Sequence, residues 1–229
     1  MKMKFGAIVT DGRGKIGGQV ASKNRSGAYL RTKVTPVNRQ SASQTAVRNR
    51  LAGLSQGWRS LSDAQRAAWN AAVGDFAKTN IFGDLVNPTG FNLYQRLNNN
   101  LIRIGESAIT TPPTPAAITD IVIGALTMDA SDGSVSLAYT AGGDAGSEIE
   151  VWATPPVSAG VSFVKSEYRL VTQVTANTAS PLDMAADYIA KFGAITGAAG
   201  MKVFVKTVAI SVTTGQAGVP QTTSGIIAA

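Results

Sequence analysis

The side chains able to do chemistry in this 229-residue chain are carboxylates, amides, hydroxyls and cations, because the sequence contains neither cysteine nor histidine. That composition excludes disulfides, thiolate metal sites, thiol nucleophiles and imidazole bases. A histidine-based hydrolase triad and a structural zinc site are therefore excluded as well. A glycosidase needs only two carboxylates, so the acids are the first candidates for catalysis.

The acids do not form a catalytic pair in the sequence pattern. Asp63, Asp75 and Asp84 are scattered over expected helix starts, helix ends and loops. Glu148 and Glu150 are two residues apart on an expected strand, so both point to one face, which we expect to be solvated. No aromatic cluster lies near any pair of acids. We therefore expect a protein that is not an enzyme and that has no cofactor, no metal and no small-molecule substrate.

Gly12, Gly14 and Gly17 match the spacing G-x-G-x-x-G. A dinucleotide-binding loop with this spacing also needs a preceding strand, a long following helix and an acid about 20 residues further on. Turn residues follow Gly17 instead, and no acid occurs between it and position 40. The glycines therefore indicate turns with positive φ.

The cations carry the strongest signal. Residues 1–104 hold 16 lysines and arginines against 4 acids, whereas residues 105–229 hold 5 against 10. Such polarity is typical of a surface that lies against nucleic acid, an acidic neighbour or the acidic half of an identical subunit. The residues expected to contact a subunit or an anion are Arg13, Lys15, Lys23, Arg25, Arg31, Lys33 and Arg39.

Residues 1–40 predict a glycine-rich basic β-arm of short strands, within residues 5–9, 19–22 and 28–34. In the last of these, Leu30, Thr32 and Val34 alternate with more polar side chains, so one side can be buried. An arm this polar buries little of its own surface, and we expect it to become ordered on neighbouring subunits.

Residues 41–109 predict a three-helix platform. Ser41 or Ser43 can cap the first helix, and Ser62 with Gln65 forms a capping box for the second. Thr89 or Asn87 can cap the third helix. The first helix has an apolar stripe at Val47, Leu51, Leu54 and Trp58.

The two tryptophans, Trp58 and Trp69, fall on consecutive helices, so we expect them to meet across an αα-hairpin that Leu61 closes. Residues 81–85 form an apolar loop that we expect to tuck under the helices. The expected helical core consists of Leu54, Trp58, Leu61, Trp69, Phe76, Phe91 and Tyr94.

A helix-turn-helix is an alternative for this basic region, but the second helix begins with Asp63, an acid that would meet phosphate. The cations of the arm suit phosphate or an acidic protein surface better than they suit base recognition. Nonspecific DNA contact therefore remains open.

The prolines of residues 110–116 predict an extended linker, and residues 117–229 predict an all-β sandwich of about seven strands. Asp132-Gly133 signals a hairpin, and Ser180 can cap a short helix over residues 181–192. The sequence has no apolar run that indicates a signal peptide or a membrane span. The expected fold is thus α+β and multidomain.

Two resemblances add to this interpretation. Tyr139, the strand at residues 201–208 and the turn at residues 215–220 resemble a fibronectin type III or immunoglobulin-like module, although Met201 stands where that family has a corner tyrosine. Residues 6–104, from Gly12-Arg13-Gly14-Lys15 to Ala67-Ala68-Trp69, are similar to uncharacterised proteins of tailed bacteriophages.

The phage resemblance implies a virion structural protein whose partners are identical subunits and other virion proteins. Two rival functions remain: nonspecific nucleic-acid binding through the arm, and carbohydrate binding by aromatic platforms on the sandwich. The platform candidates are Trp152, Phe163, Tyr168 and Tyr188.

Overall fold

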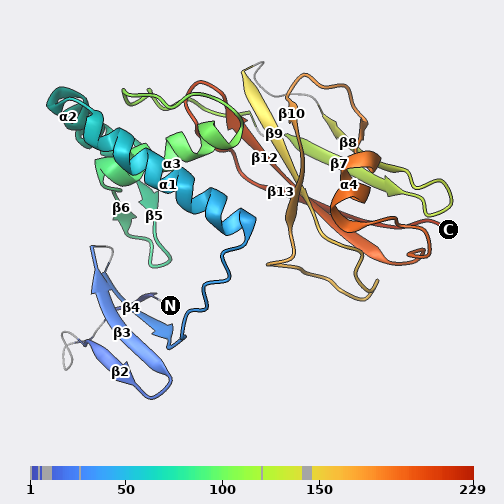
Figure 1. Cartoon of the computed structure of the whole chain (residues 1–229), viewed down its shortest axis with the longest axis horizontal. Coiled ribbons are helices and arrows are strands. Elements are labelled where there is room, and N and C mark those ends of the chain that lie inside the picture. The colour runs from blue at the N-terminus through green and yellow to red at the C-terminus, as the bar shows by residue number, and fades with distance from the viewer. Residues whose placement is uncertain (1, 5, 7–11, 26, 120, 141–145) are drawn as a thin grey trace.

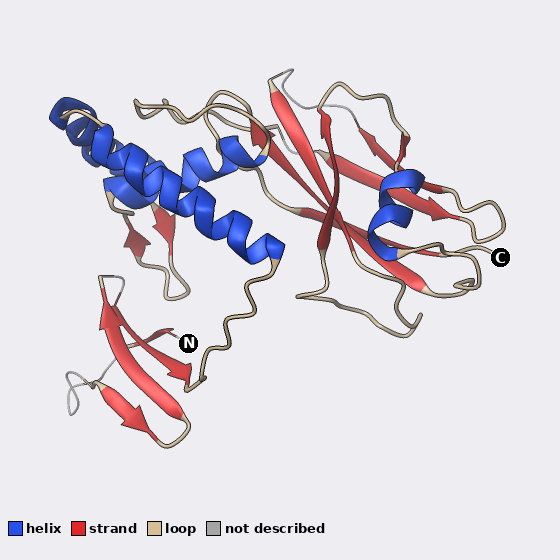
Figure 2. Cartoon of the chain, viewed as in Figure 1, coloured by secondary structure: helices blue, strands red, loops and turns tan. Residues whose placement is uncertain are grey.

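The structure, a computed structural model, describes residues 2–4, 6, 12–25, 27–119, 121–140 and 146–229. Helices and antiparallel sheets follow one another along the chain in three groups: an N-terminal sheet, a set of helices, and two C-terminal sheets (Figures 1 and 2). Residues 33–41 run as an extended connection between the first group and the second.

The N-terminal sheet, called the arm sheet below, has the strand order β1-β4-β3-β2. Its strands are β1 (Lys2–Met3), β2 (Gly14–Ile16), β3 (Gln19–Asn24) and β4 (Gly27–Thr32). Gly17, with φ of 56°, forms the turn between β2 and β3, so the G-x-G-x-x-G motif lies in a hairpin. No helix follows β3 in the arm sheet, which agrees with the expected turns.

The described part of the arm sheet has almost no core of its own. Among its described residues, the buried apolar side chains are Ala21 and Ala28. The expected burial of Thr32 and Val34 is wrong: β4 ends at Thr32, and both side chains are exposed because no described residue covers the end of the strand. Of the strand predicted at residues 5–9, only Gly6 lies within the described residues, and it is not in a strand.

The helical group comprises α1 (Ala42–Ser60), α2 (Asp63–Ala71), the 3-10 helix η1 (Ala72–Phe76) and α3 (Gly90–Arg103). A two-stranded hairpin of β5 (Lys78–Thr79) and β6 (Leu85–Val86) precedes α3. The expected caps are present at Ser41, Ser62 and Thr89, each accepting a hydrogen bond from the backbone three residues on. The first two are complete capping boxes.

The core of the helical group is centred on Tyr94 of α3. The rings of Trp58 and Trp69 each lie 5.4 Å from the Tyr94 ring, so α3 provides the aromatic ring that both tryptophans contact. The prediction that the two tryptophans meet each other directly is thereby corrected. Trp58 also packs edge-on against Phe91, which is half-buried. Leu54, Leu61 and Phe76 are buried in the same cluster, as expected.

Two predictions about this group are wrong. Val47 and Leu51 are exposed because the N-terminal half of α1 extends beyond the part that α3 covers. Residues 81–84 form the tip of the β5–β6 hairpin and Leu85 begins β6; Ile81 and Leu85 are 75% and 72% exposed, so this segment does not tuck under the helices.

The C-terminal part contains two antiparallel sheets. The three-stranded sheet has the order β11-β8-β7, from β7 (Val122–Met128), β8 (Val135–Thr140) and β11 (Leu182–Asp183). The four-stranded sheet has the order β10-β9-β12-β13, from β9 (Ser147–Ala153), β10 (Arg169–Thr175), β12 (Lys202–Ser211) and β13 (Gln221–Ile226). The expected hairpin at Asp132-Gly133 joins β7 to β8.

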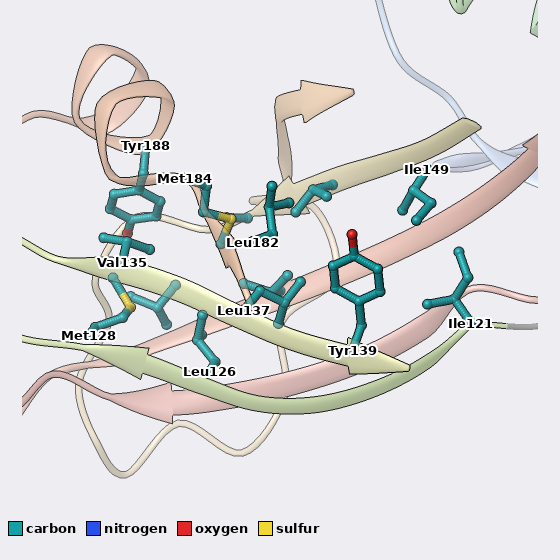
Figure 3. Packing of buried hydrophobic residues seen from close by; sticks show 14 of the residues in the cluster. Ile121, Leu126, Met128, Val135, Leu137, Tyr139, Ile149, Leu182, Met184 and Tyr188 are labelled. Carbon is teal, nitrogen blue, oxygen red and sulfur yellow. The ribbon is translucent and has the colours of Figure 1, made fainter. Parts of the chain in front are cut away.

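One hydrophobic cluster lies between these two sheets (Figure 3). It receives Leu137 and Tyr139 from β8 and, on the other side, Ile149, Val151 and Ala153 from β9, as the alternation of β9 predicts. The Tyr139 hydroxyl donates a hydrogen bond of 2.6 Å to the Thr178 carbonyl.

The expected helix over residues 181–192 is shorter than predicted. Residues Leu182–Asp183 form β11, which pairs with β8, and α4 (Ala185–Phe192) begins only after Met184. Ser180 does not cap it; its hydroxyl accepts a hydrogen bond from the Tyr139 backbone instead. Pairing with β8 therefore overrides the local helical spacing.

Candidate subunit-contact surface

All seven cations expected to contact a subunit or an anion are exposed. In the arm sheet, Lys15 and Arg31 both lie opposite Val20, so these two cations share one face with a half-buried apolar residue between them. Lys23 lies opposite Ala28 on the other face. The arm therefore presents positive charge on both faces.

The remaining cations lie off the strands. Arg25 occupies the turn between β3 and β4, Arg13 precedes β2, and Lys33 and Arg39 lie on the extended residues 33–41. The seven residues thus do not converge on one spot. Their spread suits an extended contact better than a pocket for one small anion.

The one ion pair that the structure describes between the arm and the helical group joins Lys4 to Asp84. Lys4 Nζ donates to Asp84 Oδ1 at 3.0 Å, and the same ammonium lies 5.4 Å from the centre of the Phe82 ring. Asn80 donates to the other carboxylate oxygen. These contacts hold the pKa of Asp84 below its usual value, with the Lys4 hydrogen bond as the largest cause.

Apolar side chains accompany these cations on the exposed arm. Ile16 is 70% exposed, and Val34 and Val37 on the extended connection are 65% and 77% exposed. An isolated exposed apolar residue is ordinary, but three of them on a segment whose described residues bury only two alanines are candidates for burial against another molecule.

A second feature, at the junction of the helical group with the four-stranded sheet, contradicts a sequence prediction. Glu150 does not face solvent: its side chain is fully buried. Nε of Arg103, the last residue of α3, lies 2.6 Å from Glu150 Oε1. The N–H does not point along this ion-pair contact as a hydrogen bond requires.

Neutral donors complete the environment of Glu150. Gln173 Nε2 donates to Glu150 Oε1 and to the Arg103 carbonyl, both at 3.1 Å, and Trp152 Nε1 donates to Glu150 Oε2 at 3.2 Å. The physical reason for the wrong prediction is that the C-terminal end of α3 covers this face of the sheet (Figure 1).

The pair Glu148 and Glu150 is poorly suited to glycoside cleavage. Glu150 is enclosed by protein groups and has no open side for a sugar. Burial, together with repulsion from Glu106 and Glu150, raises the pKa of Glu148. The arrangement holds two parts of the chain together and offers no access to a substrate.

The junction has further polar contacts that sequence patterns did not indicate. Asn100 Nδ2 donates to the Gly215 carbonyl at 2.8 Å, and Gln216 Oε1 accepts from the Ala116 backbone at 2.9 Å. Gly215 has φ of 67°, and an added Cβ would collide with the Leu97 carbonyl. No local signal links these residues because the partners are 115 and 100 positions apart.

The aromatic platforms considered for carbohydrate binding are mostly occupied. Tyr188 is fully buried, so its proposed exposure is wrong; α4 turns the ring into the core. The Lys206 ammonium lies 5.1 Å from the Trp152 ring and 4.9 Å from the Tyr168 ring. Of the four candidates, Phe163 is freely exposed, at 75%.

Within the described ranges, no three acidic side chains come close enough together to hold a metal ion. The described helices include none that is both long and apolar enough to cross a bilayer.

Comparison with protein families, with curated proteins and with solved structures found no match for this chain. The functional conclusion therefore depends on the chain's own surfaces and contacts.

Proposed function

We propose that this protein is a self-assembling structural component of a bacteriophage virion, such as a head–tail connector, tail or capsid-associated protein. Its basic N-terminal arm interlocks with neighbouring subunits, and its C-terminal part is displayed as an immunoglobulin-like β-sandwich. The protein is made in the bacterial host cytoplasm and resides in the virion. Its partners are identical subunits and other virion proteins.

The observation that carries this proposal is the state of the arm sheet. It is a folded sheet with two buried alanines as its described apolar core, and one described ion pair, Lys4–Asp84, connects it to the helical group. Burying Ile16, Val34 and Val37 against another subunit would contribute about 1.5–3 kcal/mol for each side chain. A neighbouring copy therefore supplies the apolar contacts that the described residues of the arm lack.

The strand order supports the displayed module. Three strands, β7, β8 and β11, face four strands, β9, β10, β12 and β13, across one core. Along the chain, β7 and β8 begin one sheet, β9 and β10 pair into the other, β11 returns to the first sheet, and β12 and β13 complete the second. This two-sheet arrangement is the one expected of a fibronectin type III or immunoglobulin-like sandwich.

Light scattering on the full-length protein tests assembly. We expect a mass that is a multiple of 23.6 kDa for the full-length protein, and the smaller mass of a single 189-residue chain (229 − 40) after residues 1–40 are deleted. A sharper variant replaces Ile16, Val34 and Val37 with serine and is also expected to dissociate.

The matched control replaces three apolar residues of the C-terminal part that are similarly exposed, Val122, Phe163 and Ile226, with serine. This control should remain assembled. A full-length protein that is monomeric at every concentration, or a control that dissociates as readily as the arm variant, would overturn the proposed role of the arm. Mass spectrometry of purified particles tests the virion location.

A further inference from the structure

A groove runs between the arm sheet and the helical group and is referred to here as the basic groove. It consists of two neighbouring cavities, of ≈ 350 and ≈ 300 Å³, that share Lys2, Arg25 and Asn80 in their walls. The wall residues come from the hairpin of β5 and β6 and from the segment around the end of β3 and the start of β4, and Figure 1 shows these elements near one another. Residues from opposite ends of the first hundred positions therefore form one surface.

Four cations line one of the two cavities: Lys2 and Arg25 from the arm side, and Lys78 and Arg96 from the helical side. That cavity has no acid in its wall. Among the described residues, none of these four cations has a carboxylate within ion-pair distance. Asp75 lines an adjoining cavity with Lys78 and Arg96, but no described carboxylate forms an ion pair with the four cations, so the groove holds a concentration of positive charge.

Arg96 is the most informative of the four cations. It is half-buried on α3, and its guanidinium lies 5.8 Å from the centre of the Phe76 ring, which fixes its direction. Partial burial lowers the pKa of Arg96, so leaving this cation without an anion is unfavourable. A partly desolvated guanidinium held on an aromatic ring is well prepared to bind an oxyanion.

Neutral donors surround the cations. The amides of Asn80, Asn87 and Asn92 and the hydroxyls of Thr79 and Thr89 line the same cavity. Cations mixed with amides and hydroxyls are the side chains that proteins use to contact phosphates and sugars.

We propose that the basic groove binds the phosphate backbone of a nucleic acid. The cations extend along two connected cavities, which fits a chain of repeated anions better than one small ion. At the other end of the groove, Lys4 already neutralises Asp84, the acid in that wall. This site goes beyond subunit assembly. Of the groove cations, only Arg25 is also one of the seven cations expected to contact a subunit or an anion.

Fluorescence anisotropy with the full-length protein tests the groove, using a labelled 20-nucleotide oligo-dT and a 20-base-pair duplex as probes in 50–200 mM NaCl. The variant Lys78→Gln/Arg96→Gln should weaken binding about 10- to 100-fold at the lowest salt. The slope of log K against log [NaCl] should become shallower by about 1.4 for oligo-dT or about 1.8 for the duplex.

The matched control is Lys165→Gln/Lys191→Gln, which removes two exposed cations of the C-terminal part and leaves the groove intact. It should change neither affinity nor slope. If loss of Arg96 prevents folding, as judged by circular dichroism, Lys2→Gln/Arg25→Gln tests the same groove from the arm side.

Binding of either probe that only groove variants weaken supports the site, and the tighter probe identifies the form of nucleic acid. The proposal is overturned if neither probe binds at 50 mM NaCl, if the control weakens binding equally, or if poly-L-glutamate binds more tightly than both probes. None of these results alters the light-scattering test of assembly, so the two proposals can fail separately.

Discussion

Replacing Arg103 with methionine should destabilise the protein far more than removal of an ordinary surface cation. The substitution keeps an unbranched apolar stem but leaves the Glu150 carboxylate buried without its cation. Removing one partner of a buried ion pair typically costs about 3–5 kcal/mol. Arg103 is 28% exposed, so solvent already screens part of the interaction, and we expect a loss of about 3 kcal/mol.

Two companion variants separate the charge effect from packing. Glu150→Gln removes the buried charge, keeps a similar shape, and leaves Arg103 able to reach water, so it should cost about 1 kcal/mol. In the double variant the uncompensated charge is absent. Arg103→Met/Glu150→Gln should therefore be more stable than Arg103→Met alone by about 1 kcal/mol or more.

Urea unfolding followed by circular dichroism and tryptophan fluorescence measures these differences. The control is Arg66→Met, which breaks a 2.7 Å ion pair with Asp63 on the surface of α2, where Asp63 is 99% exposed. Its cost should stay below about 1 kcal/mol. If Arg103→Met costs no more than Arg66→Met, or if the double variant is the least stable of the set, the buried pair does not stabilise the junction.

Three further predictions concern other contacts. Gly215→Ala should cost about 1–3 kcal/mol in urea unfolding, because its Cβ collides with a carbonyl of α3 and its φ is positive, whereas Gly160→Ala, in open space, should cost little. Tyr188→Phe should cost about 1–3 kcal/mol, since it leaves the buried Thr154 carbonyl without its 2.8 Å donor; a cost near zero would contradict this. Burial raises the pKa of Tyr188. The stability that its protonated hydroxyl contributes is therefore complete below pH 10 and is lost as pH rises through the folded-state pKa. Tyr188→Phe should lack this pH dependence. The pKa of Asp84 measured by NMR should lie below 3.8 in the parent protein and should return towards 3.8 in Lys4→Met. The Lys4–Asp84 ion pair should therefore contribute its full stability above pH 3.8 and lose it as pH falls through the folded-state pKa of Asp84. An unchanged Asp84 titration in Lys4→Met would show that the ion pair does not form.

Local features of the fold were predictable because they depend on neighbouring residues. A capping box needs residues three positions apart, so Ser41 with Gln44 and Ser62 with Gln65 are visible in the sequence and present in the structure. The Asp132-Gly133 hairpin and the alternation of β9 are local in the same sense.

The same alternation failed at Glu150 for a physical reason. A period of two tells which residues share a face of a strand, but it does not tell whether another element covers that face. Here the end of α3 covers it, so a residue expected in water is buried beside Arg103. The exposed half of the α1 stripe at Val47 and Leu51 is the converse case, an apolar pattern that no described element buries.

The charge asymmetry of this chain and the weak core of its arm are properties of the sequence, since both follow from composition and glycine content alone. Tertiary structure decided where the charge is concentrated. Lys2, Arg25, Lys78 and Arg96 span 94 positions and share no motif, and they line one groove because the arm sheet folds back beside the β5–β6 hairpin. Contacts between residues so far apart arise from the packing of whole elements, which no local pattern encodes.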